Sequence, residues 1–179
     1  IAVNTLGHSH PHLIAALTEQ AGKLWHTSNL YRIPGQEIVA KMLAALSGLD
    51  QVFFCNSGAE ATEAAVKIAR RAAYEKGEPE RMTILCATGA FHGRTLGMLA
   101  ATDRPVFRTG FGPMPAGFDH VSFGNLNALR AVLGPHVAAV MVESVQGEGG
   151  AKQVPDGYLA GVREAVSYTH LTLPTTGSV

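Results

Sequence analysis

The sequence predicts an α/β fold in which a parallel sheet lies between two layers of helices. Short, continuously apolar runs, which are typical of buried strands, alternate along the chain with segments of helical period. Polar turns that contain glycine follow several of these runs and lead into helices, as in strand–helix–strand units with right-handed crossovers. A length of 179 residues and a hydrophobic fraction of 46% are sufficient for a buried core and exclude a disordered chain.

Residues 1–50 are expected to form a helical segment that precedes the sheet. Between Pro11 and Trp25, apolar residues recur every three or four positions, which indicates an amphipathic helix with proline in its first turn. A second helix is predicted from Gln36 to Ser47, with Gly48 as its stop. Because the sequence begins with Ile1 and not with Met, we expect it to start inside a longer protein.

Residues 51–166 are expected to carry the α/β core. Its strands are predicted at four apolar runs, Val52–Cys55, Thr83–Ala87, His120–Phe123 and Val137–Glu143. Its helices are predicted at four segments of helical period, Ala61–Lys76, Thr95–Ala101, Leu126–Leu133 and Pro155–Val166. The stretch from Arg104 to Gly117 is rich in glycine and proline and is expected to be a long loop.

The last thirteen residues, 167–179, differ in style from the rest of the chain. They include four threonines and no charged residue, and no helical or strand period continues into them. They resemble translated cloning sequence, so we expect a tail that takes no part in the fold.

The composition argues against several classes of partner. Lys and Arg total 14, as do Asp and Glu, and this balance gives no electrostatic reason to expect nucleic acid or an anionic membrane. No apolar stretch approaches the roughly 20 residues that a membrane helix needs. His8, His10 and His12 alternate, but Pro11 and the lack of a Cys or carboxylate partner argue against a metal site.

The chain has two cysteines, Cys55 and Cys86, each inside an apolar run. This placement predicts two buried thiols and not a disulfide scaffold. A reducing compartment, the cytoplasm, is the expected location.

The turn from Asn56 to Glu60 is the first candidate site. The amino end of a helix offers free N–H groups and a partial positive charge to an anion, and Gly58 allows close approach to the backbone. Ser57 adds a hydroxyl donor, so Ser57, Gly58 and Ala59 are candidates to bind phosphate. Ser57 and Glu60 also have the spacing of a capping box, so an ordinary capped helix explains the same residues.

Two further turns are expected at the same edge of the sheet, because the carboxyl ends of parallel strands meet there. The first carries Phe91 and His92, on which a planar ligand could stack, although Phe91 alone also fits a core anchor. The second carries Glu143 and Glu148, which could orient a ligand or pair with an arginine, although a solvated Glu148 is the simpler alternative. Neither a P-loop nor a G-x-G-x-x-G dinucleotide motif occurs.

These three segments, in this order, resemble the class III pyridoxal-phosphate-dependent aminotransferases, most closely their acetylornithine branch. The resemblance covers nearly all of residues 1–166 and is carried by five runs, Val3–His8, Trp25–Tyr31, Phe53–Ala61, Phe91–Leu96 and Gln146–Gly150. It implies the three-layer parallel-sheet core of a fold-type I transferase, in incomplete form. Residues 51–166 would be part of the large domain that binds pyridoxal 5'-phosphate (PLP).

The resemblance implies a role for each cofactor-binding residue. Ser57, Gly58 and Ala59 would hold the cofactor phosphate. Phe91 would stack on the pyridine ring with His92 beside it. Glu143 would belong to the hydrogen-bond network near the ring hydroxyl.

The resemblance also implies an activity, the transfer of the ω-amino group of N-acetylornithine, or a similar amine, to 2-oxoglutarate in arginine biosynthesis. Asn29 and Tyr31 would line the substrate entrance, and Glu148 would be a switch carboxylate that pairs with a substrate-binding arginine. Family members are homodimers, and the same is expected here. An aminomutase or racemase of the same fold, or a non-catalytic module that binds a phosphate ligand, is the alternative.

Two catalytic residues of the family have no match in the sequence. One is the aspartate that pairs with the pyridine nitrogen of the cofactor, and the other is the lysine that forms the Schiff base. The resemblance implies that both follow Val166. None of the five lysines stands in a matching motif, whether Lys23, Lys41, Lys67, Lys76 or Lys152. We therefore expect the 179-residue chain by itself to be inactive.

Overall fold

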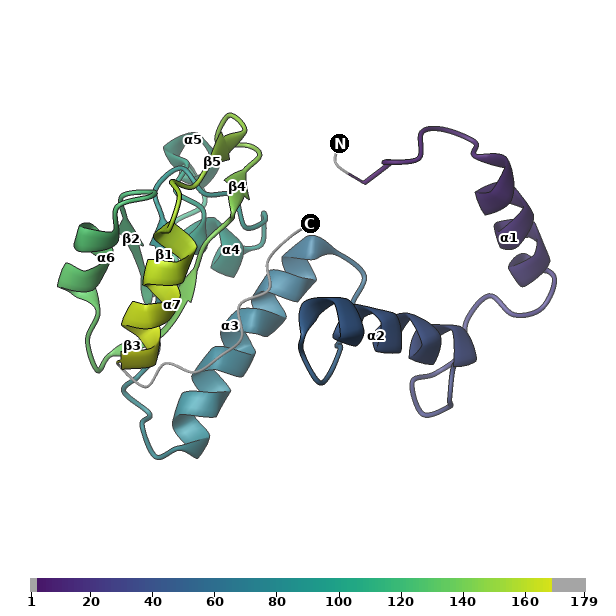
Figure 1. The fold of residues 1–179 in the computed structure, drawn as a ribbon, viewed down its shortest axis with the longest axis horizontal. Coiled ribbons are helices and arrows are strands. Elements are labelled where there is room, and N and C mark those ends of the chain that lie inside the picture. Colours follow the sequence, from purple (N-terminus) through teal and green to yellow (C-terminus); the bar gives the residue numbers. More distant parts are fainter. Residues whose placement is uncertain (1–2, 169–179) are drawn as a thin grey trace. The chain divides into compact units, whose positions relative to one another are not determined.

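The computed structural model describes residues 3–168, which divide between Val52 and Phe53 into two compact units (Figure 1). The first unit contains two helices, α1 (Pro11–Ala21) and α2 (Pro34–Ser47). α1 ends before the predicted Trp25 because Gly22 is a poor helix former, and the Trp25 indole instead donates to the Ala21 carbonyl at 2.7 Å. α2 stops at Gly48, as predicted, where the backbone is left-handed with φ of 70°.

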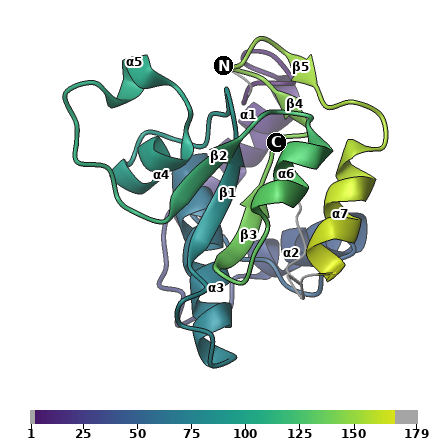
Figure 2. The same ribbon diagram turned by 90° about the vertical axis from the view of Figure 1, so that its left-hand side faces the viewer.

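The second unit is built on a parallel sheet of three strands in the order β2-β1-β3 (Figure 2). The strands are β1 (Thr83–Ala87), β2 (Phe118–Val121) and β3 (Val137–Met141). Five helices and a short antiparallel hairpin complete the unit, namely α3 (Gly58–Glu75), α4 (Leu96–Ala101), α5 (Pro105–Arg108), α6 (Leu126–Val132), α7 (Tyr158–Tyr168), β4 (Val145–Gln146) and β5 (Lys152–Gln153). β1 is the central strand and bonds to both of its neighbours.

Helices cover both faces of this sheet, which confirms the predicted three-layer α/β class. Side chains of β1 alternate between the faces, since Ile84 and Cys86 pack with α3 and α4, whereas Leu85 packs with α6 and α7. Figure 1 shows α3 on one side of the sheet and α6 and α7 on the other. Burial on both faces explains why the run from Ile84 to Ala87 is apolar throughout.

The strand predicted at Val52–Cys55 is wrong. These residues are irregular, and within residues 3–168 no strand pairs with them. A strand needs a ladder partner for its backbone groups, and apolar composition does not supply one. The prediction of two buried thiols fails with it, because Cys55 is exposed. Cys86 is buried, and burial raises the pKa of its thiol to about 12.

Other boundaries differ by a few residues. β2 begins at Phe118 and not at His120. The backbone amide of Ile84 in β1 donates to the Gly117 carbonyl, so pairing with β1 starts two residues before the predicted strand. The predicted loop at 104–117 contains α5, which starts at Pro105, and the β4–β5 hairpin was not predicted. α7 continues through Tyr168, so the expected tail is helical at its start, and residues 169–179 lie outside the described residues.

Within residues 3–168, none of the helices combines the length and the apolar character that a bilayer crossing requires.

Replacement of Leu129 by Ala should lower the free energy of unfolding by about 2–5 kcal/mol, because this fully buried side chain of α6 fills the core under α7. Leu159→Ala in α7 is the matched control, since that side chain is 42% exposed and its loss should cost far less. Urea unfolding followed by circular dichroism measures both variants. Equal losses for the two variants would contradict this account of the core.

Candidate cofactor and substrate site

The amino end of α3 forms a complete capping box. Ser57 has an extended backbone, and its Oγ accepts from the Glu60 amide at 3.1 Å, while the Glu60 carboxylate accepts from the Asn56 amide. In the described part of the chain, no group accepts a hydrogen bond from the backbone amides of Gly58 and Ala59. A Cβ on Gly58 would meet nothing within 4 Å. The positive end of this long helix therefore has two free N–H groups, and the space at Gly58 is open.

A close backbone approach joins this helix end to the turn after β1. Gly93 has φ of 132°, and a Cβ on it would lie 3.0 Å from the Ala59 Cβ and 3.1 Å from the Met98 Cβ. Only glycine fits there without displacing the helix. The Thr62 hydroxyl of α3 also donates to the His92 carbonyl at 2.8 Å. The predicted phosphate turn and the predicted ring-binding turn therefore lie against each other.

His92 is held from both sides of its backbone. Its amide donates to the buried Thr102 hydroxyl at 2.9 Å, and its carbonyl accepts from Thr62. The imidazole is only 7% exposed, and its buried Nε2 has no hydrogen-bond partner among the described residues. Burial, with a smaller contribution from His120, lowers the pKa of His92 to about 4. The ring is therefore neutral at physiological pH.

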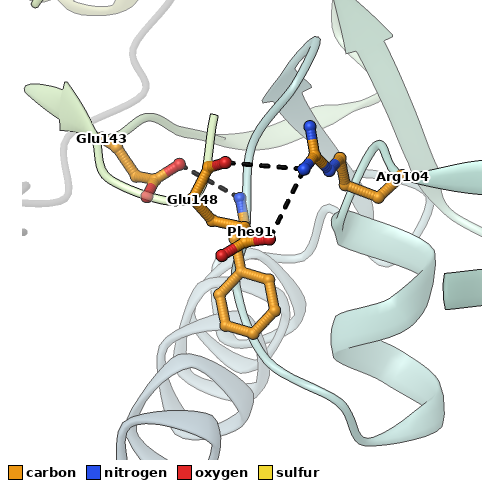
Figure 3. A network of polar contacts seen from close by, with 4 residues as sticks. All are labelled: Phe91, Arg104, Glu143 and Glu148. Atoms are coloured by element: carbon orange, nitrogen blue, oxygen red, sulfur yellow. Dashed lines mark hydrogen bonds and ion pairs between the residues drawn. The ribbon is translucent and has the colours of Figure 1, made fainter. Parts of the chain in front are cut away.

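Phe91 lies between the sheet edge and α5. Its amide donates to Glu143 Oε2 at 3.1 Å, so the segments that follow β1 and β3 meet at this bond (Figure 3). Its half-buried ring packs edge-on against Phe107 at a centroid distance of 6.0 Å, and the Arg94 guanidinium lies 3.7 Å from the Phe107 centroid. Desolvation raises the pKa of Glu143, although the Phe91 amide opposes this shift.

Glu148 lies in the loop between β4 and β5 and is paired with Arg104. The Arg104 guanidinium is 3.4 Å from Glu148 Oε1 and 3.5 Å from the Glu148 carbonyl (Figure 3). Both side chains are partly exposed, at 35% for Arg104 and 47% for Glu148, so the pair contributes little to stability and separates easily.

Contacts join three of the predicted turns within the second unit, whereas two of the predicted residues belong to the first unit. Gly93, the residue after His92, lies against Ala59, and the Thr62 hydroxyl of α3 donates to the His92 carbonyl. The Phe91 amide donates to Glu143. Asn29 and Tyr31 are exposed residues of the first unit, so their place at the substrate entrance stays a prediction.

Sequence reasoning missed the residues that hold these turns in place. Thr62 stands in a helix of ordinary composition, Thr102 directly follows α4, and Arg104 is the first residue of the predicted long loop. Their partners lie between 10 and 44 positions away, so no local pattern marks them. Gln146 is fully buried and was noted only as part of a family run.

The family model described as aminotransferase class-III matches residues 1–172. The chain belongs to the class III aminotransferases. It is 52% identical over 169 residues to the acetylornithine aminotransferase of Rhodobacter capsulatus, a match that covers 94% of the chain and 43% of that protein. Identity to the acetylornithine aminotransferase of Mesorhizobium japonicum is 53%, over 92% of the chain and 41% of that protein.

Solved structures agree with this membership. The ornithine aminotransferase of Toxoplasma gondii has a TM-score of 0.88 and 34% identity, over 94% of this class III chain and 41% of that protein. Another structure of the Toxoplasma enzyme is described as having partial occupancy of PLP at the active site. Class III aminotransferases are PLP-dependent. This chain spans about two fifths of the length of the curated relatives that it matches.

The neutral, buried His92 makes stability depend on pH. The unfolded chain protonates this imidazole near pH 6.5, whereas the folded chain does so only near pH 4, so stability present above pH 6.5 is lost as the pH falls toward 4. The loss amounts to on the order of 3 kcal/mol. His92→Gln should flatten this slope in urea unfolding measured from pH 4 to 7, and an unchanged slope would refute the assignment.

Proposed function

We propose that this chain supplies the cofactor-binding part of an aminotransferase that moves the ω-amino group of N-acetylornithine, or a similar amine, to 2-oxoglutarate in arginine biosynthesis. The curated relatives with about 50% identity carry the name acetylornithine aminotransferase and support this substrate pair. The observation that carries the proposal is the approach of Gly93 to Ala59, because it brings the Phe91 turn against the first turn of α3, whose leading amides are free.

The residues of this site fit PLP. The free amides of Gly58 and Ala59, with the Ser57 hydroxyl, would hold the phosphate in the open space above Gly58. The half-buried Phe91 ring would stack on the pyridine, with the neutral His92 beside it.

When bound, PLP serves as an electron sink for bond cleavage at the amino-bearing carbon. The carboxyl of Glu143, held by the Phe91 amide and with a raised pKa, would take part in hydrogen bonding near the ring hydroxyl. Glu148, whose partly exposed pair with Arg104 separates easily, would act as the switch carboxylate and exchange partners when a dicarboxylate binds. Asn29 and Tyr31 would line the substrate entrance.

We further propose that the protein is a cytoplasmic homodimer, in which residues 1–50 form a helical segment and 51–166 part of the PLP-binding large domain. Among the described residues of α1 and α2 none is buried. Large apolar side chains on these helices are exposed instead, among them Leu13, Ile14, Leu17, Ile38, Met42 and Leu46. An apolar surface of this kind is typical of a subunit interface.

A chimaeric enzyme tests both the activity and the phosphate site. In it, the matched segment of this chain replaces its counterpart in the Rhodobacter capsulatus enzyme. The chimaera should convert N-acetylornithine and 2-oxoglutarate, and absence of this activity in a folded chimaera would overturn the proposed function.

Gly58→Val in the chimaera should weaken PLP retention about tenfold or more, because the new side chain fills the open space next to the free amides. Ser57→Ala should weaken retention as well, and it also removes a helix cap worth about 1 kcal/mol. Ala61→Val is the control, since the Ala61 amide already bonds to the Ser57 carbonyl. Cofactor absorbance after dialysis measures retention, and equal retention in all variants would refute the phosphate assignment.

The 179-residue chain alone should yield no single, stoichiometrically labelled lysine when PLP and borohydride are added. All five lysines are exposed and none stands in the family's motif, so any labelling should be low and spread among them. Peptide mass spectrometry locates the label. One dominant modified lysine would contradict the expected inactivity of the chain.

A further inference from the structure

The buried amide of Gln146 joins the β4–β5 hairpin to the turn after β1. Its side chain is 1% exposed, and its Nε2 donates to the Thr88 carbonyl at 2.9 Å, across 58 positions of sequence. Thr88 is itself fixed to β2, because its amide donates to the Val121 carbonyl and its hydroxyl accepts from the Phe123 amide. The Gln146 amide therefore attaches the hairpin to a rigid point of the sheet edge.

Two glycines make room for this amide. A Cβ on Gly89 would lie 3.2 Å from Gln146 Oε1, and Gly89 also has φ of 75°. A Cβ on Gly149 would lie 2.8 Å from the same oxygen and 3.0 Å from the Gly89 carbonyl. Side chains at either position would displace the amide or separate the two turns.

The two turns joined in this way carry Phe91 and Glu148. Phe91 follows Gly89 by two residues, and Glu148 follows Gln146 by two residues. The loop that holds Glu148 is closed on itself, since the amides of Gly150 and Ala151 both donate to the Gly147 carbonyl. A displacement at Gln146 therefore moves Glu148 with it.

We infer that Gln146 is a positioning residue, which sets the place of the Glu148 carboxylate relative to the Phe91 turn. This role rests on the proposed function, in which Phe91 faces the cofactor and Glu148 the substrate. The ion pair between Glu148 and Arg104 is partly exposed and weak, so the buried hydrogen bond from Gln146 to Thr88 is the contact that holds the hairpin in place.

Hydrogen exchange on the 179-residue chain tests the contact without any need for activity. Gln146→Met keeps the length of the side chain but removes its donor, so amides of residues 145–153 should exchange about three- to tenfold faster. Gln153→Met is the matched control, because Gln153 is an exposed residue of the same hairpin and should leave exchange unchanged. Equal acceleration by both variants, or by neither, would overturn the inference.

Gln146→Glu distinguishes loss of the hydrogen-bond donor from a change in the shape of the side chain. A protonated glutamic acid can donate to the Thr88 carbonyl, whereas the ionised carboxylate cannot. Burial at this position should raise the pKa of the new carboxyl well above its usual range, so that it is protonated at pH 5 and ionised at pH 8. The ratio of variant to parent exchange should therefore approach one at pH 5 and rise at pH 8, while the ratio for Gln146→Met stays constant. A pH-independent ratio for Gln146→Glu would contradict the role of the donor.

Kinetics of the chimaera test the consequence for the reaction. Gln146→Met should raise KM for 2-oxoglutarate about tenfold while kcat of the half-reaction with the amino donor changes less than twofold, because only Glu148 is displaced. An unchanged KM in an active chimaera would overturn the positioning role. An inactive parent chimaera would instead refute the proposed function, and the exchange data would still decide whether Gln146 holds the hairpin.

Discussion

The contact between Gly93 and Ala59 decides what this sheet edge can do. A helix whose first amides are free and a turn that carries an aromatic ring and an imidazole occur in many α/β proteins, and separately each is ordinary. Here the missing side chain of Gly93 lets the turn lie against the first turn of α3, and the Thr62 hydroxyl fixes the distance through the His92 carbonyl. The free amides of α3 and the turn with the aromatic ring are thus neighbours, which is the arrangement that a phosphorylated aromatic cofactor requires.

Elements of the fold were predictable from the sequence where burial requires a continuous run of apolar residues. The central strand Thr83–Ala87 was predicted with its observed ends, since both of its faces are covered and every position is apolar or small. The run Val52–Cys55 has a similar composition but has no strand paired with it in the described part of the chain. Pairing between distant segments cannot be predicted from a local sequence pattern. The β4–β5 hairpin escaped prediction because its two-residue strands are too short to show a period.

The site was predictable as a set of turns but not as a set of contacts. The carboxyl ends of parallel strands lie at one edge of a sheet, so the sequence alone indicated that Phe91 and Glu143 would lie close together there. The strand predicted before Ser57 does not form, so the place of Ser57 depends on the packing of α3. The bond from the Phe91 amide to Glu143 and the burial that keeps His92 neutral depend on tertiary packing. The partner of Glu148 illustrates the limit, since Arg104 stands 44 positions away in a segment with no motif of its own.

The two cysteines lie in different environments, so a thiol reagent can label one of them selectively. The Cys86 thiol is buried and, with a pKa of about 12, is almost never a thiolate at neutral pH, whereas the Cys55 thiol is exposed. Cys55 stands two residues before Ser57, and its Sγ lies 3.5 Å from the Ser57 carbonyl. A thiol-reactive fluorophore would therefore attach selectively beside the predicted phosphate turn and report on occupation of that turn, with no cysteine added or removed.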